Sequence, residues 1–161
     1  MIRIGQGLDF HRFTEGRKLI LGGVEIDYHL GLAGHSDADV LLHCLSDAIL
    51  GALALGDIGE HYNDKDPRWK DLDSSIILKD VLEMTRKKGY NLVNIDLTLI
   101  GEEPKLNPYK EKIKNNLGQL TGLRIDRINL KATTTETMGD LGRKEGLGAL
   151  GVVLLERTRN E

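Results

Sequence analysis

Hydrophobic and polar residues follow one another in patterns that predict an ordered series of strands and helices. Residues 2–11 and 18–27 have the pattern of strands, and Gly22-Gly23 interrupts the second, which predicts a bulge or a close backbone approach. Residues 37–55 predict a helix, because apolar side chains recur at three- and four-residue spacing and form one wide face.

The second half of the chain continues the alternation of elements. It predicts a helix over 74–88 capped by Asp73 or Ser74, a strand over 92–100, a helix from Pro108 to about Leu120, and strands near 125–133 and 147–157. Strands that alternate with helices, together with adjacent strand pairs, favour an α/β (α+β) fold: a mixed sheet covered by helices in one domain spanning 1–161. The long polar connection 57–67 has no clean period, and we interpret it as an active-site loop.

Two details of the 37–55 helix can be tested against a structure. Ser36 is its expected N-cap, with Asp39 three residues further on. Ala38, which lies between them, should be accommodated inside the helix because alanine is a good helix former.

Composition narrows the classes of protein. The chain has 161 residues and a net charge of −3, from 22 basic and 25 acidic residues, so it has no overall attraction for nucleic acid or anionic membranes. Its single cysteine, Cys44, lies in an apolar run, which predicts a core position and suits a reducing compartment. No apolar run approaches the roughly 20 residues of a membrane-spanning helix, and the first residues lack the form of a targeting peptide. These features predict a cytoplasmic protein.

One group of side chains near the N-terminus suits a metal ion. Asp9 and His11 are two residues apart in a predicted strand and point to the same side, and the following helix can bring His43 to them. Three nitrogen or oxygen ligands with one open position are typical of catalytic zinc, and the single cysteine argues against a structural zinc site. Spacing alone leaves the alternative open that His43 is a core histidine satisfied by one carboxylate. Asp39 and Asp47, four residues before and after His43, are candidates to orient its imidazole.

A second group lies where Lys131-Ala132-Thr133-Thr134-Thr135-Glu136 leaves a predicted strand. Hydroxyls and free backbone N–H groups can hydrogen-bond phosphate oxygens, and a carboxylate beside them makes sense if Mg²⁺ bridges it to the phosphates. The alternative is an ordinary strand edge, because threonine is a common strand residue.

Several motifs that follow one another along the chain together resemble those of a known family, which the spacing of single residues could not indicate. They are Asp9-x-His11, His35-Ser36-Asp37-x-Asp39 with His43, Asp57-Ile58-Gly59, Asp64-x-Asp66-Pro67, Pro104-Lys105 and the Lys131 to Glu136 segment. Over essentially its whole length the chain resembles the 2-C-methyl-D-erythritol 2,4-cyclodiphosphate synthase family.

The resemblance implies a homotrimeric, metal-dependent phosphorus–oxygen lyase of non-mevalonate isoprenoid biosynthesis. Such an enzyme converts 4-diphosphocytidyl-2-C-methyl-D-erythritol 2-phosphate to 2-C-methyl-D-erythritol 2,4-cyclodiphosphate and CMP. The substrate's own 2-phosphate attacks its β-phosphorus, so no protein nucleophile is needed. This agrees with a sequence that offers no obvious nucleophile–base pair and suggests catalysis by positioning and charge stabilisation.

By the same resemblance, Asp9, His11 and His43 hold one Zn²⁺ per subunit, His35 and Thr134 stabilise the transition state, and Glu136 binds Mg²⁺ or Mn²⁺ with the substrate diphosphate. The wider substrate site that it implies comprises Asp9, His11, His35, Ser36, Asp57, Ile58, Gly59, Tyr62, Asn63, Asp64, Lys65 and Asp66, then Gly101, Glu102, Glu103, Pro104, Lys105, Leu106, Asn107, Ala132, Thr133, Thr134, Thr135 and Glu136, and finally Arg143. The resemblance places the cytidine pocket, Gly101 to Asn107 with Ala132 to Thr135, across a subunit boundary from the zinc. Arg143 is also open to a simpler interpretation as part of a solvated charge pair.

Two other functions stay open at this level. A trimeric metal- or nucleotide-binding protein could keep the pocket without turnover, although the intact motif residues argue against it. A zinc phosphohydrolase would incorporate water and release a linear product, whereas the cyclase consumes no water.

Overall fold

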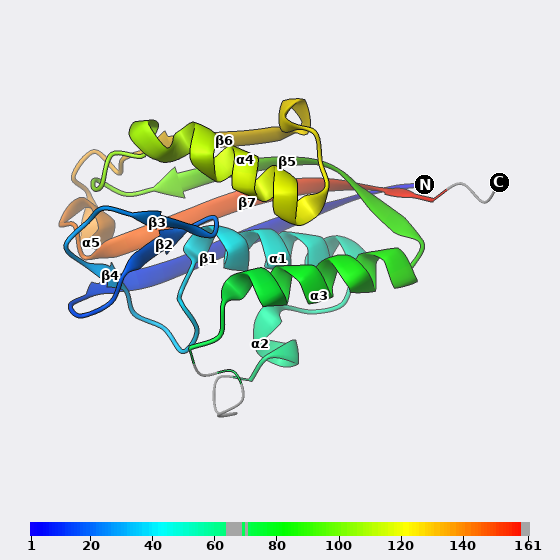
Figure 1. Cartoon of the computed structure of the whole chain (residues 1–161), viewed down its shortest axis with the longest axis horizontal. Helices are drawn as coiled ribbons and strands as arrows, with labels where there is room; N and C mark the ends of the chain where they lie inside the picture. Colours follow the sequence, from blue (N-terminus) through cyan, green and yellow to red (C-terminus); the bar gives the residue numbers. More distant parts are fainter. Residues whose placement is uncertain (64–68, 70, 159–161) are drawn as a thin grey trace.

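The computed structural model describes residues 1–63, 69 and 71–158, and its centre is a five-stranded sheet of order β4-β1-β7-β5-β6 (Figure 1). Strands β5 and β6 are parallel and the other neighbouring pairs are antiparallel, so the sheet is mixed. The strands are β1 (Ile2–Thr14), β4 (Gly31–Leu32), β5 (Tyr90–Ile100), β6 (Ile128–Thr133) and β7 (Gly146–Arg157).

Three long helices cover one face of this sheet and contact one another. They are α1 (Val40–Leu53), α3 (Ser74–Lys87) and α4 (Lys110–Thr121); the short helices are α2 (Ile58–His61), α5 (Gly139–Gly142) and 3-10 turns at Asn107–Tyr109 and Ile125–Arg127. Alternate residues of β5, among them Ile95, Leu97 and Leu99, are buried beneath the helices. The predicted mixed sheet covered by helices is therefore confirmed.

The segment predicted as one strand over 18–27 is a hairpin of β2 (Leu19–Leu21) and β3 (Val24–Ile26). Gly22 and Gly23 form its turn, with φ angles of 59° and 74°. A two-residue hairpin turn of this type needs positive φ at both positions, which glycine adopts at little cost. The prediction that Gly22-Gly23 interrupts the strand is confirmed, but at these two residues the chain reverses its direction completely.

The start of α1 corrects two predictions. Its N-cap is Asp39, whose carboxylate accepts the backbone N–H groups of Leu41 and Leu42, so Ser36 is not the cap. Ala38 has φ of 57° and lies in the left-handed turn before the helix, so the expectation that it sits inside the helix was wrong. The physical reason is that a carboxylate two and three residues before free N–H groups is a strong helix start.

Strand β1 and helix α1 lie in unusually close contact. Added side chains at Gly5 and Gly7 would overlap the carbonyl oxygens of Ala48 and Cys44 on α1. These glycines therefore set the distance between strand and helix. Cys44 is buried in this contact as predicted, and its burial raises the pKa of the thiol to about 12.

None of the helices in the described part of the chain is long and apolar enough to cross a membrane.

Candidate active site

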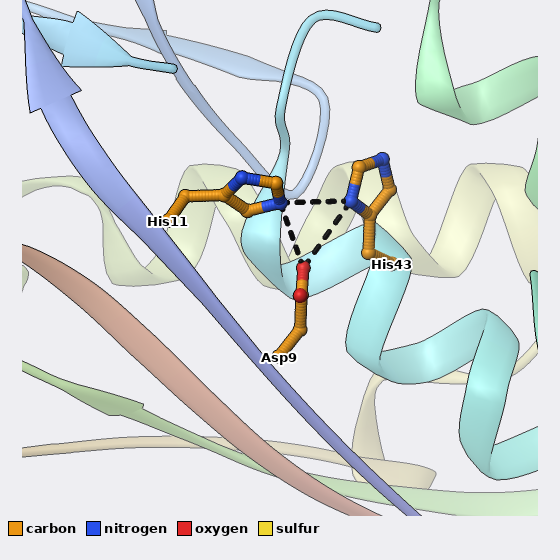
Figure 2. A group of neighbouring side chains, drawn as sticks. All are labelled: Asp9, His11 and His43. Atoms are coloured by element: carbon orange, nitrogen blue, oxygen red, sulfur yellow. Dashed lines mark hydrogen bonds and ion pairs between the residues drawn. The ribbon is translucent and has the colours of Figure 1, made fainter. Parts of the chain in front are cut away.

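Asp9 and His11 continue the β1 face that carries Gly5 and Gly7, and His43 lies one turn into α1, directly opposite. Figure 2 shows the three side chains pointing at one another. Asp9 Oδ2 lies 2.9 Å from His11 Nε2 and 3.2 Å from His43 Nδ1, and the two ring nitrogens are 3.1 Å apart. Within the described ranges this is the one cluster of ligand-type side chains arranged to hold a metal ion.

A backbone carbonyl sets the orientation of His11. Its Nδ1 lies 2.8 Å from the carbonyl oxygen of Ala33. Because a carbonyl only accepts hydrogen bonds, Nδ1 must carry the proton, and the lone pair of Nε2 faces Asp9 and His43.

The other ring, His43, turns its Nδ1 toward the cluster and its Nε2 toward two hydroxyls. Nε2 lies 2.9 Å from Ser74 Oγ, at the start of α3, and 3.0 Å from Ser36 Oγ. The imidazole is almost fully buried, so these contacts satisfy its far side.

The prediction that Asp39 and Asp47 orient His43 was wrong. Asp39 accepts hydrogen bonds from backbone N–H groups of its own helix start and of the Gly22-Gly23 turn. Asp47 Oδ1 accepts the N–H of Ile58 at 2.7 Å and so ties the predicted active-site loop to α1. Both carboxylates accept hydrogen bonds from backbone N–H groups that would otherwise lack a partner. Spacing along a helix does not reveal these contacts.

The donor set fits a divalent metal. A carboxylate oxygen and two imidazole lone pairs that converge within hydrogen-bonding distance repel one another unless a cation or a proton lies between them. Burial acts to raise the pKa of Asp9, yet His11 and His43 beside it, when their rings carry positive charge, hold it well below its usual range. Burial acts to lower the pKa of His11, yet Asp9 raises it overall. The site therefore favours positive charge, and these three ligands leave a coordination position open.

The cluster lines a cavity of about 450 Å³, which we call the metal pocket. Other predicted site residues that line it are His35, Ser36, Ile58, Gly59 and Tyr62. Asp57 caps α2 and accepts the N–H of Glu60 at 3.0 Å, which leaves its carboxylate with further acceptor capacity. The structure thus brings His35, Ser36 and part of the predicted active-site loop to the metal cluster, while Asp64, Lys65 and Asp66 lie outside the described residues.

A second cavity of about 250 Å³, which we call the threonine pocket, lies at the ends of β5 and β6. It is lined by Gly101, Glu102, Pro104, Lys105, Leu106, Asn107, Ala132, Thr133 and Thr134, nearly the whole predicted cytidine set. Glu103 instead pairs with Lys144 at 2.6 Å.

The segment after β6 is held by one carboxylate. Glu102 Oε1 accepts the backbone N–H groups of Thr135 at 3.0 Å and Thr137 at 3.2 Å. Thr134 Oγ1 donates to the exposed Glu136 at 3.1 Å, so these two predicted functional groups are neighbours. Glu136 does not join the metal cluster in this chain.

Arg143 lies in a surface ion-pair network. Its Nε lies 2.8 Å from Glu145 Oε1, and its guanidinium also contacts Asp140. These two carboxylates raise the pKa of the guanidinium, Glu145 more than Asp140.

Ser74 is the contact of the metal cluster that sequence reasoning missed. It begins the predicted helix 74–88 and was considered there only as a cap. A serine at a helix start is so common that it carries no signal of a contact with His43.

The fold and the cluster define an α/β protein with an open two-histidine, one-carboxylate metal site beside a threonine-rich loop. A family model described as the YgbB family matches residues 2–156, and the chain belongs to that family.

Curated relatives agree over their full length. A protein of Bacillus cytotoxicus named 2-C-methyl-D-erythritol 2,4-cyclodiphosphate synthase is 53% identical over 157 residues, covering 98% of this chain and 99% of the relative. One of the same name from Leptospira borgpetersenii is 55% identical, covering 96% and 98%.

Solved structures match as well. The bifunctional IspDF of Campylobacter jejuni aligns with a TM-score of 0.94 and 46% identity over 98% of this chain, which spans 42% of that longer protein. A Plasmodium falciparum IspF in complex with CDP aligns with a TM-score of 0.86 and 32% identity over 98% of this chain and 97% of the other.

Proposed function

We propose that the chain converts 4-diphosphocytidyl-2-C-methyl-D-erythritol 2-phosphate to 2-C-methyl-D-erythritol 2,4-cyclodiphosphate and CMP. This makes it a cyclising phosphorus–oxygen lyase of non-mevalonate isoprenoid biosynthesis. The observation that carries the proposal is the cluster of Asp9, His11 and His43, open to a pocket that His35 also lines. Relatives that share more than half of its residues over nearly the whole chain carry the name of that synthase.

In this reaction an oxygen of the 2-phosphate forms a bond to the β-phosphorus while the bond from that phosphorus to the CMP oxygen breaks. The chain need not supply a nucleophile, so its residues act by holding the two phosphates in line. His35, which lines the metal pocket, and Thr134, which lines the threonine pocket, would donate hydrogen bonds to phosphate oxygens. Thr134 would first release its hydrogen bond to Glu136.

The metal ligands are assigned by their chemistry. Asp9, His11 and His43 would hold Zn²⁺, which as a Lewis acid supplies charge neutralisation for phosphate when bound. Glu136 would hold Mg²⁺ or Mn²⁺, because an exposed carboxylate beside a phosphate site suits a hard cation.

The substrate is divided between the two pockets. The residues proposed to surround the methylerythritol part are Asp57, Ile58, Gly59, Tyr62, Asn63, Asp64, Lys65 and Asp66. The threonine pocket would take cytidine, a proposal supported by the CDP complex of the Plasmodium falciparum relative. Arg143 would approach phosphate only after exchanging one of its two carboxylate partners.

We also propose a homotrimer with sites at subunit interfaces. The sheet face opposite the helices exposes large apolar side chains: Ile2, Ile4, Leu8 and Phe10 of β1 with Leu150 and Val152 of β7. Ile4 is 68% and Phe10 is 54% exposed. An apolar face of this kind is typical of a protein–protein interface. The metal and threonine pockets have no lining residue in common among the described residues, and we propose that a second copy brings its threonine pocket to each metal pocket.

The whole chain, 1–161, would act as one catalytic domain. Its expected location is the cytoplasm, which suits a single buried cysteine without a disulfide partner.

The deciding experiment incubates the purified protein with the substrate, Zn²⁺ and Mg²⁺ and follows products by ³¹P NMR before and after chelation. Cyclic diphosphate plus CMP, lost on chelation, is the expected result. A linear product that incorporates ¹⁸O from water would identify a hydrolase, and no turnover by folded, metal-loaded protein would identify a binding protein.

A further inference from the structure

We propose that Ser74 and Asp37 hold His43 in the one tautomer that can bind the metal. Ser74 would thus be a positioning residue of the metal cluster. The inference rests on the metal site of the proposed function and not on the identity of the substrate.

The contacts of the Ser74 hydroxyl fix the direction of each hydrogen bond. Its Oγ contacts Asp37 Oδ1, and its backbone N–H donates to Asp37 Oδ2 at 3.1 Å. An ionised carboxylate only accepts hydrogen bonds, so the single hydroxyl proton of Ser74 points at Asp37.

The consequence falls on His43. With its proton committed, Ser74 Oγ presents lone pairs to His43 Nε2 at 2.9 Å, so Nε2 must be the donor. A neutral imidazole carries one ring proton, and Nδ1 is then left with a lone pair directed at Asp9 and His11. Metal-binding histidines commonly donate their other N–H to such an acceptor.

Ser36 lies equally near but cannot fix the tautomer. Its Oγ is 3.0 Å from His43 Nε2 and accepts the N–H of Ala38 at 3.1 Å, yet it contacts no carboxylate. Its Oγ also lies 3.5 Å from Ser74 Oγ. The Ser36 proton can therefore point to Ser74 or to His43, so Ser36 can serve His43 as acceptor or donor. Only the hydroxyl backed by Asp37 has a fixed direction.

Helix capping does not account for the Ser74 hydroxyl. The N-cap of α3 is Asp73, whose carboxylate accepts the N–H of Ser75 at 2.8 Å. Ser74 is fully buried, and its hydroxyl is directed to Asp37 and His43. Asp37, Ser74 and His43 thus form a buried polar network, and a network of this kind favours one arrangement of its hydrogen bonds.

The test compares Ser74→Ala with Ser74→Thr in the full chain. Zn²⁺ affinity is measured by chelator competition, and the His43 tautomer is read from long-range ¹H–¹⁵N spectra of metal-free protein. The spectra of all variants are taken at one and the same alkaline pH. Ser74→Ala should weaken Zn²⁺ binding by about 10- to 100-fold and mix the His43 tautomers, whereas Ser74→Thr, which keeps a hydroxyl, should retain the Nε2–H form.

Ser36→Ala is the matched control, because it removes a hydroxyl at the same distance from Nε2 with no carboxylate behind it. It should leave the tautomer unchanged. Wild-type Zn²⁺ affinity in Ser74→Ala, or weakened affinity with an unchanged tautomer, would overturn the proposal. If Ser74→Ala fails to fold, loss of the Nε2–H form in Ser74→Thr would overturn it instead. A wild-type protein that binds Zn²⁺ without turning over substrate would remove the proposed function and leave this inference standing.

Discussion

The metal pocket and the threonine pocket are built in different ways. In the metal pocket the three ligands project from a strand and a helix whose close contact is set by Gly5 and Gly7. In the threonine pocket the functional groups lie on the segments after β5 and β6, held mainly by Glu102. Metal coordination needs positions accurate to about half an ångström, which packed elements supply better than loops. A pocket formed by exposed segments can instead be completed by another copy of the chain.

The largest expected effect comes from breaking the scaffold of the metal pocket. Gly7→Ala places a methyl group against the carbonyl oxygen of Cys44, so α1 must move away from β1. We expect a loss of about 3 kcal/mol or more in the free energy of unfolding, measured by urea denaturation, since overpacking against backbone relaxes poorly.

Gly51→Ala is the control on the same helix. Outside the backbone of its own helix, its new Cβ would lie 3.7 Å from the nearest neighbouring atom, the carbonyl oxygen of Gln6, which is an ordinary van der Waals contact. Alanine in a helix should raise the free energy of unfolding by about 0.5–1 kcal/mol. Equal stability changes in the two variants would contradict the close-contact interpretation.

Removing a ligand should separate metal binding from folding. His43→Ala should reduce Zn²⁺ affinity and turnover by more than about a hundredfold. Loss of a ligand should cost more than the loss of a residue that only hydrogen-bonds a ligand. The fold should persist, because Ser36 and Ser74 lie 3.5 Å apart and can hydrogen-bond each other. Chelator competition and circular dichroism check the two halves of this prediction, and retained Zn²⁺ with full activity would refute the ligand assignment.

The opposite result is expected in the threonine pocket. Thr134→Ala removes a hydroxyl proposed to stabilise the transition state and should lower kcat by about a hundredfold. Zn²⁺ affinity should not change, because Thr134 contacts Glu136 and none of the three ligands. Loss of Zn²⁺ in this variant would mean that the two pockets are not independent.

The smallest effect should come from the carboxylate that holds the threonine segment. Glu102→Ala removes the acceptor shared by Thr135 and Thr137 and should lower kcat/KM about tenfold, the equivalent of one hydrogen bond. Glu102→Gln keeps a carbonyl oxygen at the same place and should stay within about threefold of the wild type. Steady-state kinetics at saturating Zn²⁺ distinguish the two variants.

Local patterns predicted much of the fold. The helix over 74–88 is observed as α3 (Ser74–Lys87), with Asp73 as its cap and Gly89 in the left-handed region after it. The 92–100 strand is the greater part of β5, where buried and less buried residues alternate. These features depend on a few neighbouring residues, so the sequence contains the whole signal.

The predictions were wrong where contacts between residues distant in the sequence decide the local structure. Ser36 has the residue type of a cap, but its hydroxyl lies against His43 and Ser74, and the carboxylate of Asp39 caps α1. Gly22-Gly23 was expected to be a bulge or a close backbone approach, and pairing between β2 and β3 makes it a hairpin turn.

By itself the sequence determined that Asp9 and His11 share a strand face and that a threonine segment follows a strand, since both depend on short periods. Only the tertiary structure decided that Gly5 and Gly7 admit α1 closely enough for His43 to reach them. It also decided that the hydroxyl of Ser74, 31 residues from His43 in the sequence, contacts Nε2 of the His43 ring. Such pairings are set by packing between elements, and no local pattern records which side chains will meet.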